Sequence, residues 1–219
     1  RRGRTAAYLP IDHGDIDEFL KVSTEGHPVQ NMLTAVVISD DWMESMLAGD
    51  QAKRTTWGKL LKARSELGYP YLMFSDNANK HKPDVYKDKQ LRIHQSNLCN
   101  EIYLPTSSTE SLVCVLSSMN ILHYDSWKDT DAVETLVYFL DAVVTDFLHR
   151  LESYRDSPDP ELQEMFHLME RSYTFAKRHR ALGVGTLGYA SYLQSKLLAF
   201  ESREAAKLNL QIHKLVHDK

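Results

Sequence analysis

Three side chains that can do chemistry lie close together in the stretch NLCNE, where Asn97, Cys99 and Glu101 alternate with Leu98 and Asn100. A carboxylate can accept a proton from a hydroxyl, an amide can orient that hydroxyl, and a thiol can give up a proton or a hydrogen atom. In an extended segment the three side chains point to one side, about 6.5–7 Å apart. This spacing fits a sugar-sized substrate.

The same residues also have a structural interpretation. Cys99 would be a small buried side chain, Asn97 a turn residue and Glu101 a solvated charge, and spacing alone favours this interpretation. The second cysteine, Cys114, lies in the uncharged β-prone run SLVCVLSS. The residues alone predict an inert, buried thiol at Cys114.

Strands and helices alternate around these residues. Short apolar runs predict strands at 33–39, 71–74 and 112–116. Helical spacing predicts helices at 42–47, 56–67 and 132–151, with later helices from 159, near 187 and from 203. Strands separated by helices favour an α/β layer or barrel with parallel strands, and sequence order alone leaves both open. No long linker divides the chain, so 1–219 is expected to form one domain.

Capping residues mark several helix ends. Gly68 suits the end of the 56–67 helix. Asp131 and Glu134 match a capping box at the start of the 132–151 helix. Asp159 and Pro160 suit the first two positions of the helix that follows.

Composition excludes several classes of protein. The chain has 219 residues, of which 42% are hydrophobic and 26% charged, as in ordinary globular proteins. A net charge of −4 gives no general attraction to nucleic acid or acidic membranes. No apolar run approaches the roughly 20 residues of a membrane helix, and no signal peptide is recognisable, so a cytoplasmic location is expected.

A glycine pattern and a histidine set invite hypotheses that the sequence does not favour. Gly183, Gly185 and Gly188 spell G-x-G-x-x-G without a clean preceding strand, so close packing at a strand-to-helix turn is expected rather than dinucleotide binding.

The histidines His149, His167 and His179 lack metal-ligand spacing and are expected at surface or capping positions, with no metal site. The basic run 177–180 is expected to be a solvated helix C-terminus.

The segment QSNLCNEIYLPT strongly resembles the active-site segment of the large subunit of class I ribonucleotide reductase, whose signature is Asn-Leu-Cys-x-Glu-Ile. Three more blocks match that family in the same order. They are RRGRTAAYLPIDHGDIDEFL at the start, GYPYLMFSDNAN at 68–79 and RALGVGTLGYASYL at 180–193. Four ordered blocks are far more specific than one motif, and they span nearly the whole chain.

The resemblance implies a role for each residue of the segment. Cys99 would carry a thiyl radical that abstracts the 3′ hydrogen of the substrate. Glu101 would accept the proton of the 3′ hydroxyl, and Asn97 would hydrogen-bond that hydroxyl. Together with Leu98, these residues would contact the substrate.

Other positions gain roles from the same resemblance. Cys114 matches one of two thiols that reduce the 2′ carbon and end as a disulfide, and its partner thiol has no counterpart in this sequence. Arg1 matches an arginine of the loop that passes effector identity to the substrate base. The tyrosines Tyr69, Tyr71 and Tyr103 are expected to be packing residues, since the family's radical-relay pair also has no counterpart here.

The resemblance further implies a fold and partners. The family fold is an α/β barrel of ten strands, with the active-site cysteine on a loop threaded through it, and this chain would be its central or second-half part. No cofactor would bind this chain directly. A metal-containing small subunit would supply the radical, dNTP and ATP effectors would bind the complete subunit, and thioredoxin or glutaredoxin would reduce it. The substrate would be a ribonucleoside diphosphate, with no nucleic acid or membrane partner.

The chain is expected to be a central piece of such a subunit, whether an expressed segment, a processed fragment or a split-gene product, and to be inactive alone. Two alternatives remain open from the sequence. One is a cobalamin-dependent reductase with a similar active segment. The other is a non-catalytic piece that folds only against a partner carrying the other half-barrel.

Overall fold

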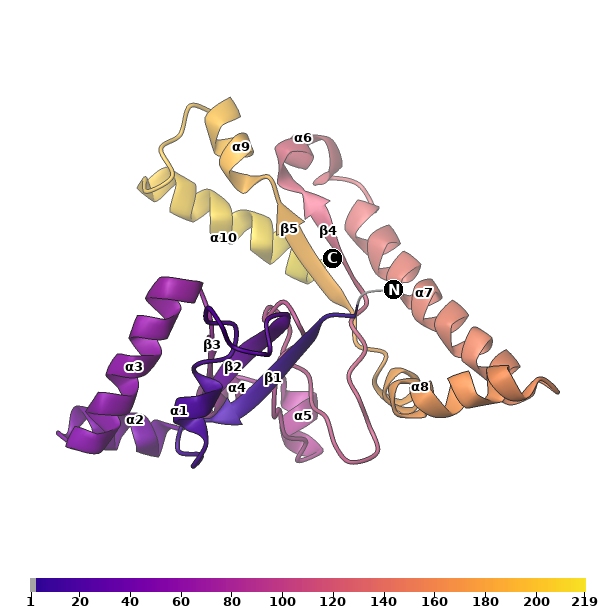
Figure 1. The fold of residues 1–219 in the computed structure, drawn as a ribbon. Coiled ribbons are helices and arrows are strands. Elements are labelled where there is room, and N and C mark those ends of the chain that lie inside the picture. Colours follow the sequence, from indigo (N-terminus) through magenta and orange to yellow (C-terminus); the bar gives the residue numbers. More distant parts are fainter. Residues whose placement is uncertain (1–2) are drawn as a thin grey trace. The chain divides into compact units, whose positions relative to one another are not determined.

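The computed structural model describes residues 3–219, so the specificity-loop prediction for Arg1 lies outside the described residues. By its contacts the chain divides into two compact units, the first ending at Ser108 and the second spanning Thr109–Lys219. Each unit has its own parallel sheet with helices (Figure 1). That 1–219 forms one domain stays a prediction.

The first unit contains a parallel three-stranded sheet. Its strands are β1 (Thr5–Pro10), β2 (Met32–Ile38) and β3 (Tyr71–Phe74), in the order β1-β2-β3. The register places Tyr8 opposite Ala35, and Ala35 opposite Tyr71. The β1 to β2 connection carries α1 (Ile16–Phe19), and the β2 to β3 connection carries α2 (Asp40–Leu47) and α3 (Gln51–Leu67). The predicted helix-separated parallel strands are therefore confirmed.

The central strand β2 is buried on both faces, as its β-branched run predicts. Ala35 and Val36 point to opposite faces, and both are 0% exposed. Val36 and Ile38 pack with Trp42 of α2 and Leu60 of α3, so the apolar stripes of the two helices cover the sheet.

Local capping explains where the helices of this unit begin and end. The Ser39 hydroxyl accepts the Trp42 N–H at the start of α2, and the Asp50 carboxylate accepts the Ala52 N–H at the start of α3. Gly68 ends α3 with φ of 75°, as predicted. Beyond β3 come α4 (Ser75–Lys80), α5 (Asp84–Asp88) and a stretch without helix or strand up to Ser108.

The second unit contains a parallel pair of strands, β4 (Leu116–Asn120) and β5 (Gly183–Leu187). Between the strands lie η1 (Ile121–His123), α6 (Tyr124–Trp127), α7 (Ala132–Arg155) and α8 (Pro160–His179). After β5 come α9 (Tyr189–Ser195) and α10 (Arg203–Asp218). The strand predicted at 112–116 is thus displaced, because only from Val115 onwards does the segment bond to the β5 region, through the Gly183 N–H.

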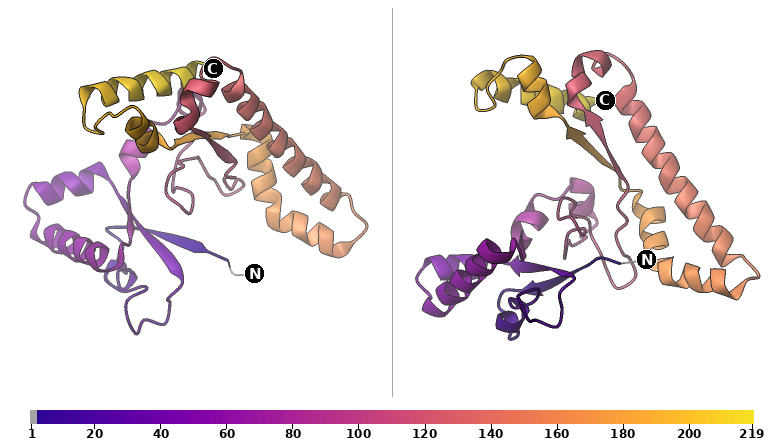
Figure 2. Two further views of the ribbon diagram at one scale, coloured as in Figure 1. Left: turned by 90° about the horizontal axis from the view of Figure 1, so that it is seen from above. Right: turned by 45° about the horizontal axis from the view of Figure 1, so that its top comes forward.

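The helices α7 and α8 form a long antiparallel hairpin (Figure 2). Val144, Leu148 and Leu151 of α7 pack against Phe166 and Tyr173 of α8. Asp159 caps α8 through the Glu161 N–H, as predicted.

The capping box predicted for α7 does not form. The Asp131 side chain makes no cap bond, and the Thr130 hydroxyl accepts the Ala132 N–H at 3.2 Å instead. A neighbouring side chain with the same acceptor chemistry has taken its place.

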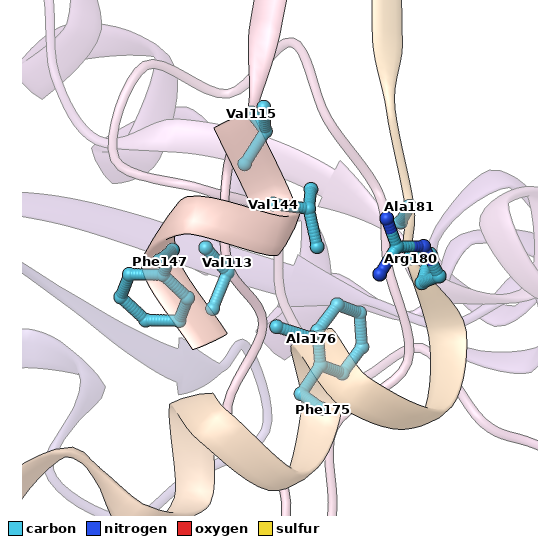
Figure 3. Close-up of a pocket in the computed structure, with 8 residues that line it drawn as sticks. All are labelled: Val113, Val115, Val144, Phe147, Phe175, Ala176, Arg180 and Ala181. Carbon is cyan, nitrogen blue, oxygen red and sulfur yellow. The ribbon is translucent and has the colours of Figure 1, made fainter. Parts of the chain in front are cut away.

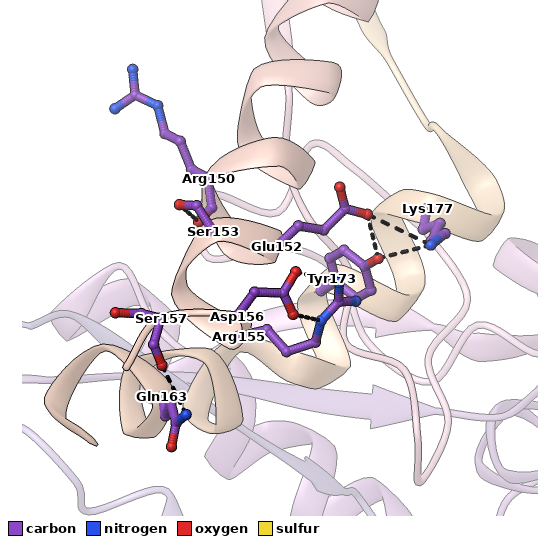
Figure 4. Close-up of polar contacts among 9 residues, drawn as sticks. All are labelled: Arg150, Glu152, Ser153, Arg155, Asp156, Ser157, Gln163, Tyr173 and Lys177. Atoms are coloured by element: carbon purple, nitrogen blue, oxygen red, sulfur yellow. Dashed lines mark hydrogen bonds and ion pairs between the residues drawn. The ribbon is translucent and has the colours of Figure 1, made fainter. Parts of the chain in front are cut away.

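Polar contacts tie the outer part of this hairpin together (Figure 4). The Tyr173 hydroxyl donates to Glu152 at 2.7 Å, and the Lys177 ammonium donates to the Tyr173 hydroxyl at 2.8 Å. The hydrogen bond from Tyr173 lowers the pKa of Glu152, against the effect of burial, with help from Lys177.

The sequence predicts that the basic run 177–180 at the end of α8 is solvated, whereas in the structure its side chains contact acidic residues. Arg178 and His179 contact Glu110, and Arg180 bonds to Asp141. The His179 side chain is 3% exposed, so of the two positions predicted for it, surface or capping, the surface position is wrong. His179 is buried because it contacts the carboxylate of Glu110, which is distant in sequence.

The glycine pattern serves close packing between β4 and β5. A Cβ on Gly185 would lie 2.8 Å from the Ser118 hydroxyl, and one on Gly188 would lie 2.7 Å from the Asn120 side-chain oxygen. Gly188 also has φ of 78° at the start of α9, a conformation that side chains disfavour. The predicted structural role of these glycines is confirmed.

Candidate active site

The segment that carries Cys99 forms a turn, and the extended conformation expected for it is wrong. The Asn97 N–H donates to the Ile102 carbonyl at 3.0 Å, and the Asn100 N–H donates to the Asn97 carbonyl at 3.2 Å. Asn100 has φ of 70°, in the left-handed region. The same-face argument from a period of two therefore does not apply to Asn97, Cys99 and Glu101.

The Asn97 side chain closes this turn. Its Oδ1 accepts the Glu101 N–H at 3.1 Å and the Ile102 N–H at 3.0 Å. Asparagine favours such local bonds to the backbone, and a strand ladder would compete with them. The Asn97 side chain thus holds the Glu101 backbone beside it. The turn, and not an extended strand, therefore brings the candidate residues together.

A polar network from two directions holds the turn. The Tyr8 hydroxyl of β1 hydrogen-bonds the Ser96 hydroxyl at 2.5 Å. Ser96 is 3% exposed and also lies 2.9 Å from the Asn100 side-chain oxygen. The Tyr103 hydroxyl donates to that same oxygen at 3.2 Å. These bonds fix Asn100 in its left-handed conformation from both sides.

Exposure differs among the predicted substrate-contacting residues. Cys99, Leu98 and Glu101 are exposed, whereas Asn97 is half-buried. The thiol of Cys99, the carboxylate of Glu101 and the amide of Asn97 therefore lie in one turn. The thiol and the carboxylate are open to a ligand.

Tyrosines surround the Cys99 turn. The pKa of Tyr71 is raised, first by its hydrogen bond with Tyr69, then by burial and by the nearby Cys99 and Tyr8. The rings of Tyr69 and Tyr71 meet edge to face at 5.1 Å, which supports the packing role predicted for them. Burial raises the pKa of Tyr103, followed by the effect of Tyr8.

A hollow of about 230 Å³ adjoins the turn at Tyr103. Its other lining residues are Leu72 and Phe74 of β3 and Asn77 and Ala78 at or after the strand's end. Ligands of parallel α/β sheets bind at the carboxyl ends of the strands, which is where this hollow lies. Its lining is mostly apolar and includes one amide, that of Asn77, a combination that is common in small-molecule sites.

The second cysteine is also exposed, so the buried position expected for Cys114 from its residues alone is wrong. Cys114 lies between Val113 and Val115, which line a small apolar cavity with Val144, Phe147 and Phe175 (Figure 3). Neither cysteine forms a disulfide.

Sequence reasoning missed the residues that hold these positions. Tyr8 lies in the matching block RRGRTAAYLP, and Ser96 precedes Asn97 directly, yet no spacing rule pairs residues so distant in sequence. Within residues 3–219 no group of three or more His, Cys, Asp or Glu side chains is placed to hold a metal ion. Over the same residues, no helix is both long and apolar enough to span a membrane.

Comparison with protein families identifies the family to which the chain belongs. The family model for the ribonucleotide reductase barrel domain matches residues 50–219. The chain belongs to the ribonucleotide reductase family. The α/β strand pairs described above are then part of its barrel.

Individual relatives agree with this assignment. The class Id ribonucleotide reductase alpha subunit of Actinobacillus ureae superposes with a TM-score of 0.89 at 51% identity, covering 99% of this chain and 39% of that one. A ribonucleoside-diphosphate reductase large subunit of Invertebrate iridescent virus 3 is 36% identical over 73% of this chain and 23% of its own. The alpha subunit of Enterobacteria phage T4 is 32% identical over 65% and 17%.

The ribonucleotide reductase chain spans less than half the length of these relatives. Their names are those of diphosphate reductases and of class Id, a division of class I, so the cobalamin-dependent alternative is not favoured.

Proposed function

We propose that this chain carries the radical-bearing and one of the reducing thiols of a class I ribonucleoside-diphosphate reductase large subunit. The observation that carries the proposal is the turn closed by Asn97, which holds the Glu101 backbone beside the Asn97 side chain and leaves the Cys99 and Glu101 side chains exposed. Membership of the ribonucleotide reductase family supports the reaction class.

The proposed chemistry begins at the 3′ carbon of a ribonucleoside diphosphate. A thiyl radical on Cys99 abstracts the 3′ hydrogen, which forms an S–H bond and leaves a carbon radical. Glu101 accepts the 3′-hydroxyl proton, and Asn97 orients that hydroxyl. Loss of the 2′ hydroxyl as water follows from this activated state.

Reduction then needs two electrons and two protons from a pair of thiols. Cys114 supplies one thiol, and the other comes from a part of the subunit outside this sequence, because Cys99 must return its hydrogen to the 3′ carbon. The products are a 2′-deoxyribonucleotide, water and a disulfide. Thioredoxin or glutaredoxin would reduce that disulfide by thiol exchange.

The remaining partners follow from the same proposal. A metal-containing small subunit generates the radical, the rest of the large subunit encloses the turn against water, and dNTP and ATP effectors act on the complete subunit. The complete enzyme would synthesise DNA precursors in the cytoplasm.

The test places each cysteine variant in the complete large subunit with its small subunit. Cys99→Ser should abolish both deoxynucleotide formation and exchange of the substrate's 3′ hydrogen. Cys114→Ser should abolish multiple turnovers but keep the 3′-hydrogen step, and it is the matched control. Undiminished product formation by Cys99→Ser would overturn the proposal.

A further inference from the structure

The second unit contains a buried carboxylate, Glu110, that has no part in the chemistry proposed for Cys99 and Cys114. Glu110 is 4% exposed. Its two oxygens bond to consecutive residues at the end of α8: Arg178 at 3.0 Å and His179 at 3.2 Å. His179 is itself 3% exposed and packs on the Phe175 ring at 4.6 Å.

This contact is strong enough to keep a buried acid charged. Burial acts to raise the pKa of Glu110, but the hydrogen bonds from His179 and Arg178 outweigh it and hold the pKa below its usual value. A buried carboxylate that lost these partners would be costly, so the contact fixes Glu110 to α8.

The backbone that follows Glu110 is held at several points on both sides of Cys114. The Ser111 N–H donates to the Arg171 carbonyl on α8 at 3.1 Å. Val113 and Val115 enter the apolar cavity between α7 and α8. The Val115 carbonyl accepts the Gly183 N–H at 2.9 Å, where pairing with β5 begins.

Cys114 thus lies between two anchors, with its neighbours pointing into the core and its own side chain exposed. We propose that Glu110, gripped by Arg178 and His179, is a positioning residue that fixes where the Cys114 thiol is presented. The proposal rests on the reducing role proposed for Cys114.

Amide hydrogen exchange in this chain tests the positioning without any activity. In Glu110→Gln, the Ser111 and Gly183 amides should exchange at least about tenfold faster, which corresponds to about 1.4 kcal/mol and is near the lower end of what a hydrogen bond to a charged group contributes. The Ile212 amide, in another core of the same unit, is the internal reference and should keep its rate. Glu164→Gln, an exposed acid on α8, is the matched control.

An unchanged rate at Gly183 would overturn the proposal, because the anchor would then not reach the Cys114 strand. A rise at Ile212 equal to that at Gly183 would overturn it too, since that indicates general destabilisation. If Glu110→Gln does not fold, Arg178→Met decides by the same readout, because the Arg178 side chain is 58% exposed and its loss is better tolerated.

A second measurement uses the complete subunit with its radical-generating partner. Glu110→Gln should lower kcat at least about tenfold with KM for the nucleotide unchanged, because a misplaced reacting group slows a step without weakening binding. A loss entirely in KM would contradict the positioning role. Activity retained by Cys114→Ser would instead contradict the proposed function, and the exchange experiment would still decide the role of Glu110.

Discussion

The Tyr8 hydroxyl on β1 hydrogen-bonds the Ser96 hydroxyl, 88 positions away, and so joins the first strand of the sheet to the turn that carries Cys99. Ser96 in turn contacts the Asn97 carbonyl at 2.9 Å. A side chain on a packed strand is a fixed reference, whereas a turn alone is not. The position of the candidate radical thiol therefore depends on a residue outside its motif.

Replacing Tyr8 tests this dependence. Tyr8→Phe should remove about 1–2 kcal/mol from the local stability of the turn, because it deletes the hydrogen bond to the buried Ser96 hydroxyl and a longer one to the Asn97 carbonyl. Faster exchange of the Glu101 and Ile102 amides, measured by NMR, is the readout. Tyr138→Phe is the matched control, since Tyr138 is 68% exposed on α7. Unchanged exchange in Tyr8→Phe would show that the turn holds itself.

Two variants of Asn97 separate its role in closing the turn from any role toward substrate. Asn97→Asp keeps the acceptor for the Glu101 and Ile102 N–H groups, so both amides should stay protected. Asn97→Ala removes the acceptor and should cost about 1–2 kcal/mol locally. Both variants lose the amide N–H that would orient a substrate hydroxyl. Equal amide protection in the two variants would contradict the closing role.

The first parallel sheet could be predicted in part from sequence. The 33–39 and 71–74 runs are β2 and β3 almost to the residue, because each is a continuous apolar run, although only β2 is buried on both faces. In contrast β1 and β5 were missed. The apolar run of β1, AAYL, has no β-branched residue, and β5 pairs with β4 through glycines that carry no hydrophobic signal.

The candidate site was found by motif, but its geometry was not. Asn97, Cys99 and Glu101 are close because an asparagine side chain outcompetes strand pairing, whereas alternation had suggested an extended segment. Likewise Glu110 and His179 are 69 positions apart, and only tertiary packing brings them together. Local pattern holds no information about such contacts.

The pH dependence of stability should report the Glu110 contact. A carboxyl whose folded pKa is lowered stabilises the protein above its unfolded pKa of about 4.3, and that contribution is lost as pH falls through the folded pKa. The free energy of unfolding, measured in urea from about pH 5.5 to about pH 3, should therefore fall less steeply in Glu110→Gln than in the parent. Glu164→Gln should keep the parent's slope. Identical slopes in all three proteins would show that Glu110 has no lowered pKa.

The packing of β5 on β4 can be tested at a single glycine. Gly185→Ala would place a Cβ 2.8 Å from the Ser118 hydroxyl, so it should destabilise the second unit by about 1–3 kcal/mol. Gly58→Ala, in the interior of α3 with nothing within 4 Å of the new Cβ, should instead stabilise by up to about 1 kcal/mol.

A compensating change makes the test of Gly185 specific. Adding Ser118→Gly to Gly185→Ala removes the atom that the new methyl group meets, so part of the lost stability should return, as measured by thermal unfolding. Strictly additive losses in the double variant would mean that the cost arises elsewhere than at this contact. Recovery would establish that β4 and β5 approach each other closely at Gly185 and Ser118, two residues beyond Leu116 and Gly183, where the β4–β5 pairing begins.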